Sequence, residues 1–171
     1  MDRAELQATQ APLKERYRED PGSALVTLRA SGELGAEEIA CSVETGRALV
    51  VAGLHPATGG TGALACSGDM LLQALAACAG VTLRAVATAL GVVVSGRVLV
   101  EGDLDFRGTL GVAKEEGVPV GFRAIRLRFE LSDVPDDEDQ LAALLRLTER
   151  YCVVYQTLAG GVPVDVAVTP A

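Results

Sequence analysis

Hydrophobic and polar residues alternate between positions 92 and 107 and again between positions 120 and 131. In the first segment the apolar side chains share one face of an extended chain and the polar ones share the other: Val92, Val94, Val98, Val100, Leu104 and Phe106 against Ser95, Arg97, Glu101, Asp103, Asp105 and Arg107. A period of two residues predicts a strand with one buried and one solvated face. Because a polar loop joins the two segments, they predict a long antiparallel hairpin.

Residues 67–90 form the clearest predicted helix. Ser67 suits the N-cap, Asp69 suits the positive end of the helix dipole, and Gly91 suits the C-terminal stop. Apart from Gln73, the first half of this segment is apolar on every face. Such a helix has to be buried on all sides, either by its own domain or by a second subunit.

Shorter patterns surround these elements. Residues 24–30, 38–43 and 48–51 are strand-like and indicate a β-meander, with a turn at residues 31–35. Acidic residues and Pro135 open a second helix, whose predicted buried stripe is Leu141, Leu144, Leu145 and Thr148. After it, the pattern predicts a short helix and a last strand, at residues 153–158 and 162–168.

The order of these elements, βββ-α-ββ-α(α)-β, predicts an α+β fold in which a mostly antiparallel sheet packs against segregated helices. A chain of 171 residues suits one compact domain. We assign residues 23–171 to that domain. Residues 1–22 are expected to form an N-terminal helical arm, because charged residues at helical spacing end at Asp20-Pro21-Gly22.

The overall charge excludes some partners. A formal net charge of -8 leaves no basic field for phosphates, so we do not expect nucleic acid as a partner. The longest apolar stretch, residues 70–81, is about half the length that a bilayer requires, and the N-terminus is polar from its first turn. We therefore expect a soluble cytoplasmic protein that does not bind membranes.

The chain has four cysteines, Cys41, Cys66, Cys78 and Cys152. They form no CxxC pair and do not cluster with the single histidine, His55, so the spacing predicts no zinc site. In a reducing cytosol, cysteines within apolar segments are either inert core residues or redox-active ones.

Thiol catalysis needs a cysteine whose thiolate is stabilised and a second cysteine that attacks the sulfenic acid formed by peroxide. Cys78 and Cys152 can meet this description. Cys152 follows Arg150 and Tyr151 at a predicted helix break, where a helix start is expected to lower its thiol pKa. The alternative is that both are small core residues.

Two segments then point to a family. Residues 67–78, with the glycine-rich segment before them, and residues 150–158 resemble the two signatures of the OsmC/Ohr family of organic hydroperoxide reductases. The resemblance spans roughly residues 23–169. It implies an OsmC-like fold and an intertwined homodimer with the long helices at its centre. It also implies that Cys78 is the peroxidatic cysteine and Cys152 the resolving cysteine.

The resemblance also directs attention to three supporting residues. The family's glutamate, ten positions before the peroxidatic cysteine, falls on Gly68, and Asp69 is one step away. The family's arginine lies upstream of the helix. Counting back from the cysteine reaches a position near His55 in one branch of the family and near Glu33 in the other, and Arg47 is the nearest upstream arginine. Asp69, Arg47 and His55 are therefore the candidates that would support Cys78.

The resemblance implies a thiol-dependent peroxidase in oxidative stress defence that needs no cofactor or metal. Its substrate would be an organic hydroperoxide, and an external dithiol would reset it. The alternative is an OsmC-like protein without peroxidase activity that binds a small hydrophobic ligand in a dimer-interface pocket. Inert structural thiols are a third possibility.

Overall fold

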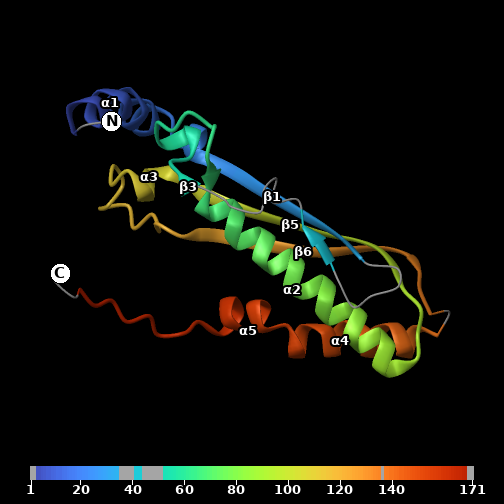
Figure 1. Cartoon of the computed structure of the whole chain (residues 1–171). Coiled ribbons are helices and arrows are strands. Elements are labelled where there is room, and N and C mark those ends of the chain that lie inside the picture. The colour runs from blue at the N-terminus through green and yellow to red at the C-terminus, as the bar shows by residue number, and fades with distance from the viewer. Residues whose placement is uncertain (1–2, 35–40, 44–51, 136, 169–171) are drawn as a thin grey trace.

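The computed structural model describes residues 3–34, 41–43, 52–135 and 137–168. Its largest element is a four-stranded antiparallel sheet with the order β2-β1-β5-β6. The strands are β1 (Leu25–Leu34), β2 (Cys41–Val43), β5 (Ser95–Asp105) and β6 (Phe122–Asp133). Together with the helices this sheet makes the fold α+β, as predicted (Figure 1).

The predicted hairpin is confirmed by the pairing of β5 with β6. Val98 lies opposite Phe129, and Val100 lies opposite Leu127, so the apolar positions of the two strands share one face. The turn predicted at residues 31–35 is wrong for residues 31–34. These residues continue strand β1, which pairs with β5 and β2. The strand predicted at residues 48–51 lies outside the described residues.

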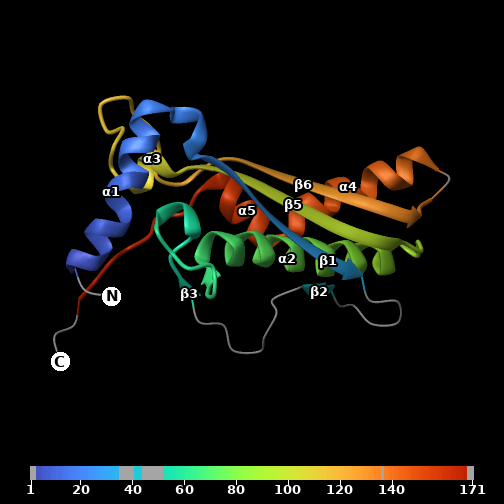
Figure 2. The ribbon, with the colours of Figure 1, turned by 90° about the horizontal axis from the view of Figure 1, so that it is seen from above.

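Helix α2 (Ser67–Leu90) runs along the sheet and has the predicted bounds (Figure 2). Its N-cap is Cys66 rather than Ser67, and Gly91 ends it in the left-handed conformation, with a φ of 69°. The buried core includes Leu72 and Leu75 from this helix, together with valines of β5. In the chain by itself, however, α2 is not buried on all sides.

Helices α4 (Glu138–Tyr151) and α5 (Val153–Gly160) pack beside α2. The acidic segment caps α4 as predicted, because the Asp137 carboxylate accepts a hydrogen bond from the backbone N–H of Asp139. Leu144 and Thr148 are the fully buried members of the predicted stripe. Cys152 separates the two helices.

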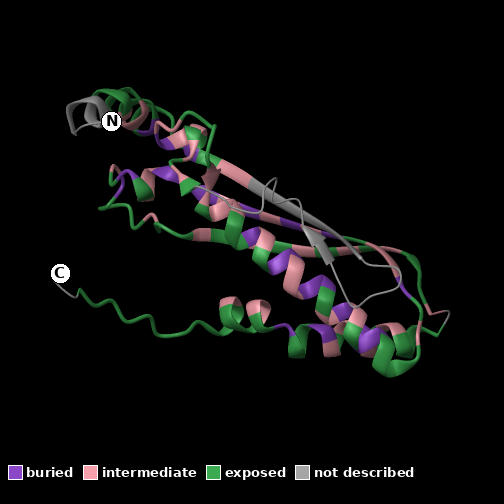
Figure 3. Ribbon diagram, viewed as in Figure 1, coloured by how far each residue is buried: buried purple, intermediate pink, exposed green. Residues whose placement is uncertain are grey.

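The last predicted strand is wrong within this structure. Residues 161–168 are extended, but they belong to no strand that the structure describes. They run past α5 toward the end of the molecule where α1 lies, away from the sheet (Figure 1). The alternating valines are therefore left in solvent, with Val166 89% exposed (Figure 3).

The N-terminal helix α1 (Arg3–Glu19) packs against a group of short elements near the start of α2. These elements are η1 (Pro21–Ala24), η2 (Pro56–Thr58) and α3 (Phe106–Thr109). A parallel pair of short strands, β3 (Ala52–Gly53) and β4 (Ala65–Cys66), leads into α2. Tyr17 of α1 is fully buried, and its hydroxyl donates a hydrogen bond to the Ala57 carbonyl over 2.7 Å. This contact ties α1 to the loop that contains His55.

Candidate active site

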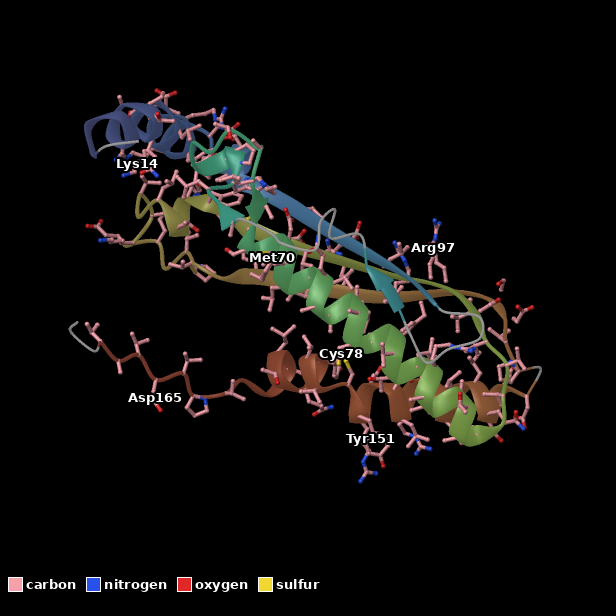
Figure 4. All side chains as sticks on the ribbon, in the orientation of Figure 1. Lys14, Met70, Cys78, Arg97, Tyr151 and Asp165 are labelled. Carbon is pink, nitrogen blue, oxygen red and sulfur yellow. The ribbon has the colours of Figure 1, made fainter. Side chains whose placement is uncertain are left out.

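Packing of the α4–α5 break against α2 brings two cysteines together. Cys78 is half-buried near the middle of α2, and Cys152 is 1% exposed at the break. Both thiols are free, and they share a side-chain hydrogen bond. Figure 4 shows the Cys78 side chain directed from α2 toward α5.

Cys152 is positioned by its place in two helices at once. Its N–H donates to the Thr148 carbonyl over 2.9 Å and so ends α4, and its carbonyl accepts from the Gln156 N–H over 2.9 Å and so begins α5. Its own backbone is extended, with φ −73° and ψ 105°. The chain therefore changes direction here, and the first N–H groups of α5 are left free of helical partners.

Those N–H groups donate hydrogen bonds to the sulfur of Cys78 and lower the pKa of its thiol. Burial raises the pKa of the Cys78 thiol, but hydrogen bonds from the Val154 N–H, the Cys152 thiol, the Thr82 hydroxyl and the Val153 N–H outweigh burial, so that the pKa of Cys78 is lowered. A helix start stabilises an anion because its N–H groups and the helix dipole both point toward it. Cys78 consequently ionises more readily than an ordinary cysteine.

Cys152 behaves in the opposite way. Burial raises the pKa of the Cys152 thiol to about 11, and the neighbouring Cys78 adds to this rise, while the N–H of Tyr155 acts against it. The sequence-based expectation that the helix start would lower the pKa of Cys152 is therefore wrong. The helix start lowers the pKa of Cys78 instead, and Cys78 lies beside a Cys152 that is protonated at neutral pH.

Asp69 and His55 lie together but away from the thiols. Asp69 precedes Cys78 by nine residues of helix, which is about 13 Å along the axis and half a turn around it. Burial raises the pKa of the Asp69 carboxyl, and the charge of His55 lowers it by less. The His55 ring stacks on Phe106 with the ring centroids 4.8 Å apart, and its Nδ1 accepts a hydrogen bond from the Ala57 N–H over 3.0 Å.

The remaining candidates are placed as follows. Arg47 lies outside the described residues, and so does the side chain of Cys41. Cys66 is half-buried at the N-cap of α2 and caps the helix with no side-chain hydrogen bond. Among the described residues, no cluster of three or more histidine, cysteine or acidic side chains could hold a metal ion.

The sequence reasoning missed Thr82 and the N–H groups of Val153 and Val154. Thr82 could have been found from its spacing, because it follows Cys78 by four residues on the same helical face. The N–H groups could not, since their contact with Cys78 depends on how α5 docks on α2.

Apolar surface lies along α2 on both sides of Cys78, and a separate apolar groove lies beside β6. Along α2, Met70 and Leu71 are each 37% exposed and Val81 is 38% exposed, so the half-buried Cys78 lies within an apolar stripe. A groove of about 960 Å³ lies between β6 and helices α4 and α5. It is lined chiefly by apolar side chains, among them Leu75, Ile125, Leu127, Phe129, Leu141, Tyr155 and Leu158.

The fold and the site define a class: an α+β protein with two neighbouring thiols, one on its long central helix and one at the break between the next two helices. Over residues 60–167, more than half of its length, the chain matches the family of OsmC-like proteins, and it belongs to that family. The matched range contains both Cys78 and Cys152. No curated protein matches the chain.

The long helix is the one described segment that could cross a membrane by length and composition alone. Its buried side chains pack against the sheet and against α4, which is the usual environment of a core helix in a soluble protein. The fold is that of a soluble OsmC-like protein.

Proposed function

We propose that this protein is a thiol-dependent peroxidase that reduces organic hydroperoxides. The observation that carries the proposal is the opposite direction of the pKa shifts of the two neighbouring thiols. The pKa of Cys78 is lowered and the pKa of Cys152 is raised, and they share a hydrogen bond. A peroxidatic cysteine has to be a thiolate, whereas a resolving cysteine has to wait as a thiol beside it.

In the first step the Cys78 thiolate attacks the terminal oxygen of the hydroperoxide. The O–O bond breaks, the alkoxide takes up a proton and leaves as an alcohol, and Cys78 becomes a sulfenic acid. The negative charge of Cys78 disappears in this step. Because Cys78 contributes to the raised pKa of Cys152, its oxidation makes Cys152 easier to ionise at the moment when Cys152 is needed.

In the second step Cys152 attacks the sulfenic sulfur. A disulfide forms, the proton of Cys152 and the sulfenic hydroxyl leave as water, and an external dithiol later reduces the disulfide by exchange. The need for a dithiol and for reduced cysteines fits a reducing compartment, so we propose a cytoplasmic location. A role in oxidative stress defence follows from the reaction.

We propose a homodimer as the working form. The stripe of Met70, Leu71 and Val81 on α2, the groove beside β6 and the exposed valines of residues 161–168 all leave apolar surface in water. A second copy of the chain would cover these surfaces. The resulting apolar approach to Cys78 would favour alkyl hydroperoxides over hydrogen peroxide.

The alternative function is binding of a small hydrophobic ligand without peroxidase activity. Gly68 at the family's glutamate position and the distance of Asp69 from Cys78 favour it. The groove of about 960 Å³ has the size of a small-molecule site. A ligand in this groove would be recognised by its shape and apolar surface.

One experiment separates the two functions. The reduced protein is mixed with cumene hydroperoxide or with hydrogen peroxide, and intact mass and peptide mass are followed over time. A peroxidase forms a disulfide between Cys78 and Cys152 faster with the organic peroxide. Cys152→Ser should stop at a sulfenic acid that dimedone traps, and Cys66→Ser is the control that should leave the reaction unchanged. Absence of the disulfide with both peroxides would exclude the two-cysteine mechanism.

A further inference from the structure

Strand β6 lies at one edge of the sheet that the structure describes. The strand order β2-β1-β5-β6 gives β6 a partner on one side, which is β5. An edge strand offers its outward N–H and C=O groups to any extended segment that can lie beside it. The outer edge of β6 can therefore accept a further strand.

The apolar face of β6 is incompletely covered along this edge. Val98 and Val100 of β5 are fully buried, but Phe129 and Leu127, which lie opposite them on β6, are only half-buried. The groove of about 960 Å³ is lined by these two side chains from the apolar face of β6 and also by Arg128 from the polar face. Because one groove contacts both faces of the strand, it reaches around the edge of β6.

The C-terminal tail, residues 161–168, contains a segment that matches this edge in length and in pattern. Residues 162–168 and residues 125–131 of β6 are each seven residues long, and both begin and end on an apolar residue. Every second position is apolar in each: Val162, Val164, Val166 and Val168 in the tail, and Ile125, Leu127, Phe129 and Leu131 in β6. An extended tail beside β6 can therefore direct all its valines toward the groove.

The charged residues of the two segments support the same alignment. Asp165 is the middle residue of its segment and Arg128 is the middle residue of its own, so they come to lie opposite each other whichever way the tail runs. Asp165 is exposed on the tail (Figure 4). Arg128 is exposed and makes a long ion pair of 3.9 Å with Glu130, which Arg97 also contacts at 2.7 Å. Opposite charges on neighbouring strands stabilise the alignment that brings them together.

The path of the tail favours a second copy as the source of the added strand. Within its own chain the tail continues from α5 away from the sheet (Figure 1). To lie beside β6 it would have to turn back across α5, whose Tyr155 and Leu158 line the groove. The tail of a second copy can approach the edge from outside. In a two-fold dimer this exchange is reciprocal, so each groove receives the tail of the other copy.

We propose that the groove beside β6 is the docking site for the C-terminal tail of a second copy of this chain. The tail adds to the sheet as a further strand, with Asp165 of one copy opposite Arg128 of the other. The inference rests on the homodimer of the proposed function. It assigns the exposed valines of the tail and the apolar groove to one interface, in which each covers the other.

Exchange of the two charges in the full-length protein tests the inference. Asp165→Arg alone or Arg128→Asp alone places like charges opposite each other twice in every dimer, so each variant should dimerise about tenfold more weakly than the wild type. An equimolar mixture of the two variants should regain the wild-type affinity as heterodimers, because both tails then meet an opposite charge. Sedimentation equilibrium measures these affinities. Variants that dimerise as tightly as the wild type, or that stay weak on mixing, would overturn the inference.

A valine of the tail tests the apolar part of the contact. Val166→Asp should also weaken the dimer about tenfold or more, since a carboxylate would have to enter an apolar groove. The Val166 side chain is exposed in the single chain, so the substitution costs the fold of the monomer little. Val93→Asp changes a similarly exposed valine outside the tail and is the matched control, which should dimerise as the wild type does. Equal affinities for Val166→Asp and the wild type would contradict docking of the tail.

Cross-linking identifies the copy from which the tail comes. With Asp165→Cys and Arg128→Cys in one chain, oxidation should give a covalent dimer in which peptide mass finds residue 165 of one copy linked to residue 128 of the other. Asp165→Cys with Arg97→Cys is the control that should not link, because Arg97 lies on β5, one strand further from the edge. A link between residues 128 and 165 within a single chain would show that the tail docks on its own sheet and would overturn the inference.

The outcomes for the tail and for the proposed function can be told apart. A wild-type protein that is a dimer, but whose affinity is insensitive to the tail variants, keeps the homodimer and refutes the tail exchange. A wild-type protein that sediments as a monomer refutes both. If tail exchange is found and the protein does not consume cumene hydroperoxide, the peroxidase proposal fails while this inference stands.

Discussion

Helix α2 carries one ionisable side chain in its first turn, Asp69, and another near its middle, Cys78. Burial disfavours the charged form of both groups. At Asp69, burial is the larger influence, the attraction of His55 is the smaller one, and the pKa of the carboxyl rises. At Cys78 the hydrogen bonds outweigh burial, and the pKa of the thiol falls.

The difference comes from what faces each group. Asp69 is attracted by the charge of His55, whose ring is engaged by stacking on Phe106 and by a backbone N–H. Cys78 faces the start of another helix, where N–H groups lack partners of their own. In this chain, therefore, the partner supplied by tertiary packing decides whether the pKa of a partly buried acid rises or falls.

The largest expected effect is the difference in peroxidase rate between a variant at Cys78 and a variant at Asp69. Cys78→Ser should reduce the rate of cumene hydroperoxide consumption by about a thousandfold or more, because a serine hydroxyl does not ionise at neutral pH. Asp69→Asn should leave the rate close to that of the wild type, since Asp69 lies away from the sulfur. Peroxide consumption coupled to dithiothreitol measures both. A severe loss in Asp69→Asn would mean that the start of α2 belongs to the site.

The second prediction removes a donor from the helix start. Val153→Pro deletes one N–H that bonds Cys78 but keeps α5, because proline is tolerated at the first helical position and the extended backbone of Cys152 suits a following proline. The pKa of Cys78 should rise, so less thiolate is present at pH 7 and alkylation of Cys78 slows about tenfold.

The matched control for this change is Val153→Ala. The Val153 side chain is 71% exposed, so alanine removes the same apolar atoms at little cost while it keeps the N–H. Iodoacetamide alkylation from pH 5 to pH 10 compares the two variants. Equal rates in the proline and alanine variants would contradict the role of the helix start.

A third and smaller effect concerns the two thiols. In the wild type, Cys78 should alkylate at lower pH than Cys152, whose pKa is raised to about 11. In Cys78→Ala the charge of Cys78 is gone, so the pKa of Cys152 should fall and its alkylation at pH 8 should become several-fold faster. Site-resolved peptide mass follows this change. An unchanged alkylation rate of Cys152 in the variant would show that the two thiols do not influence each other.

The smallest effect is on stability at the start of α2. Because the pKa of Asp69 is raised in the folded state, the folded protein binds this proton more tightly than the unfolded chain does. The free energy of unfolding should therefore fall slightly as pH rises from about 4 through the raised pKa. Asp69→Asn should lack this slope and should change stability by less than about 1 kcal/mol, as urea unfolding between pH 4 and pH 7 can measure.

Local signals predicted much of the fold. The bounds of α2 could be predicted because polar residues mark its start and Gly91 can adopt the positive φ that ends it. The hairpin could be predicted because alternation over β5 and β6 is long enough to fix which face is buried. The strand predicted at residues 162–168 failed because a strand also needs an edge to pair with, and alternation does not say where that edge lies.

In the candidate site, too, local sequence predicted some features, while others depend on tertiary packing. Cys78 and Cys152 could be identified by their positions in two motifs, and the structure places them side by side. Which thiol benefits from the start of α5 could not be predicted, since Cys152 belongs to that helix in sequence while Cys78 meets it only through packing. The separation of Asp69 from Cys78 could have been predicted from their helical spacing, but the resemblance to the family made Asp69 a candidate for the site.

The valine-rich tail has a property that follows from one residue in it. Successive residues of an extended chain offer their N–H groups to opposite sides, and Pro163 has none to offer. On the side of residues 162, 164, 166 and 168, every residue has an N–H group to donate. On the other side, the row of N–H donors is interrupted at Pro163. The tail can therefore be added at the edge of a sheet, but it is poorly suited to lie between two strands.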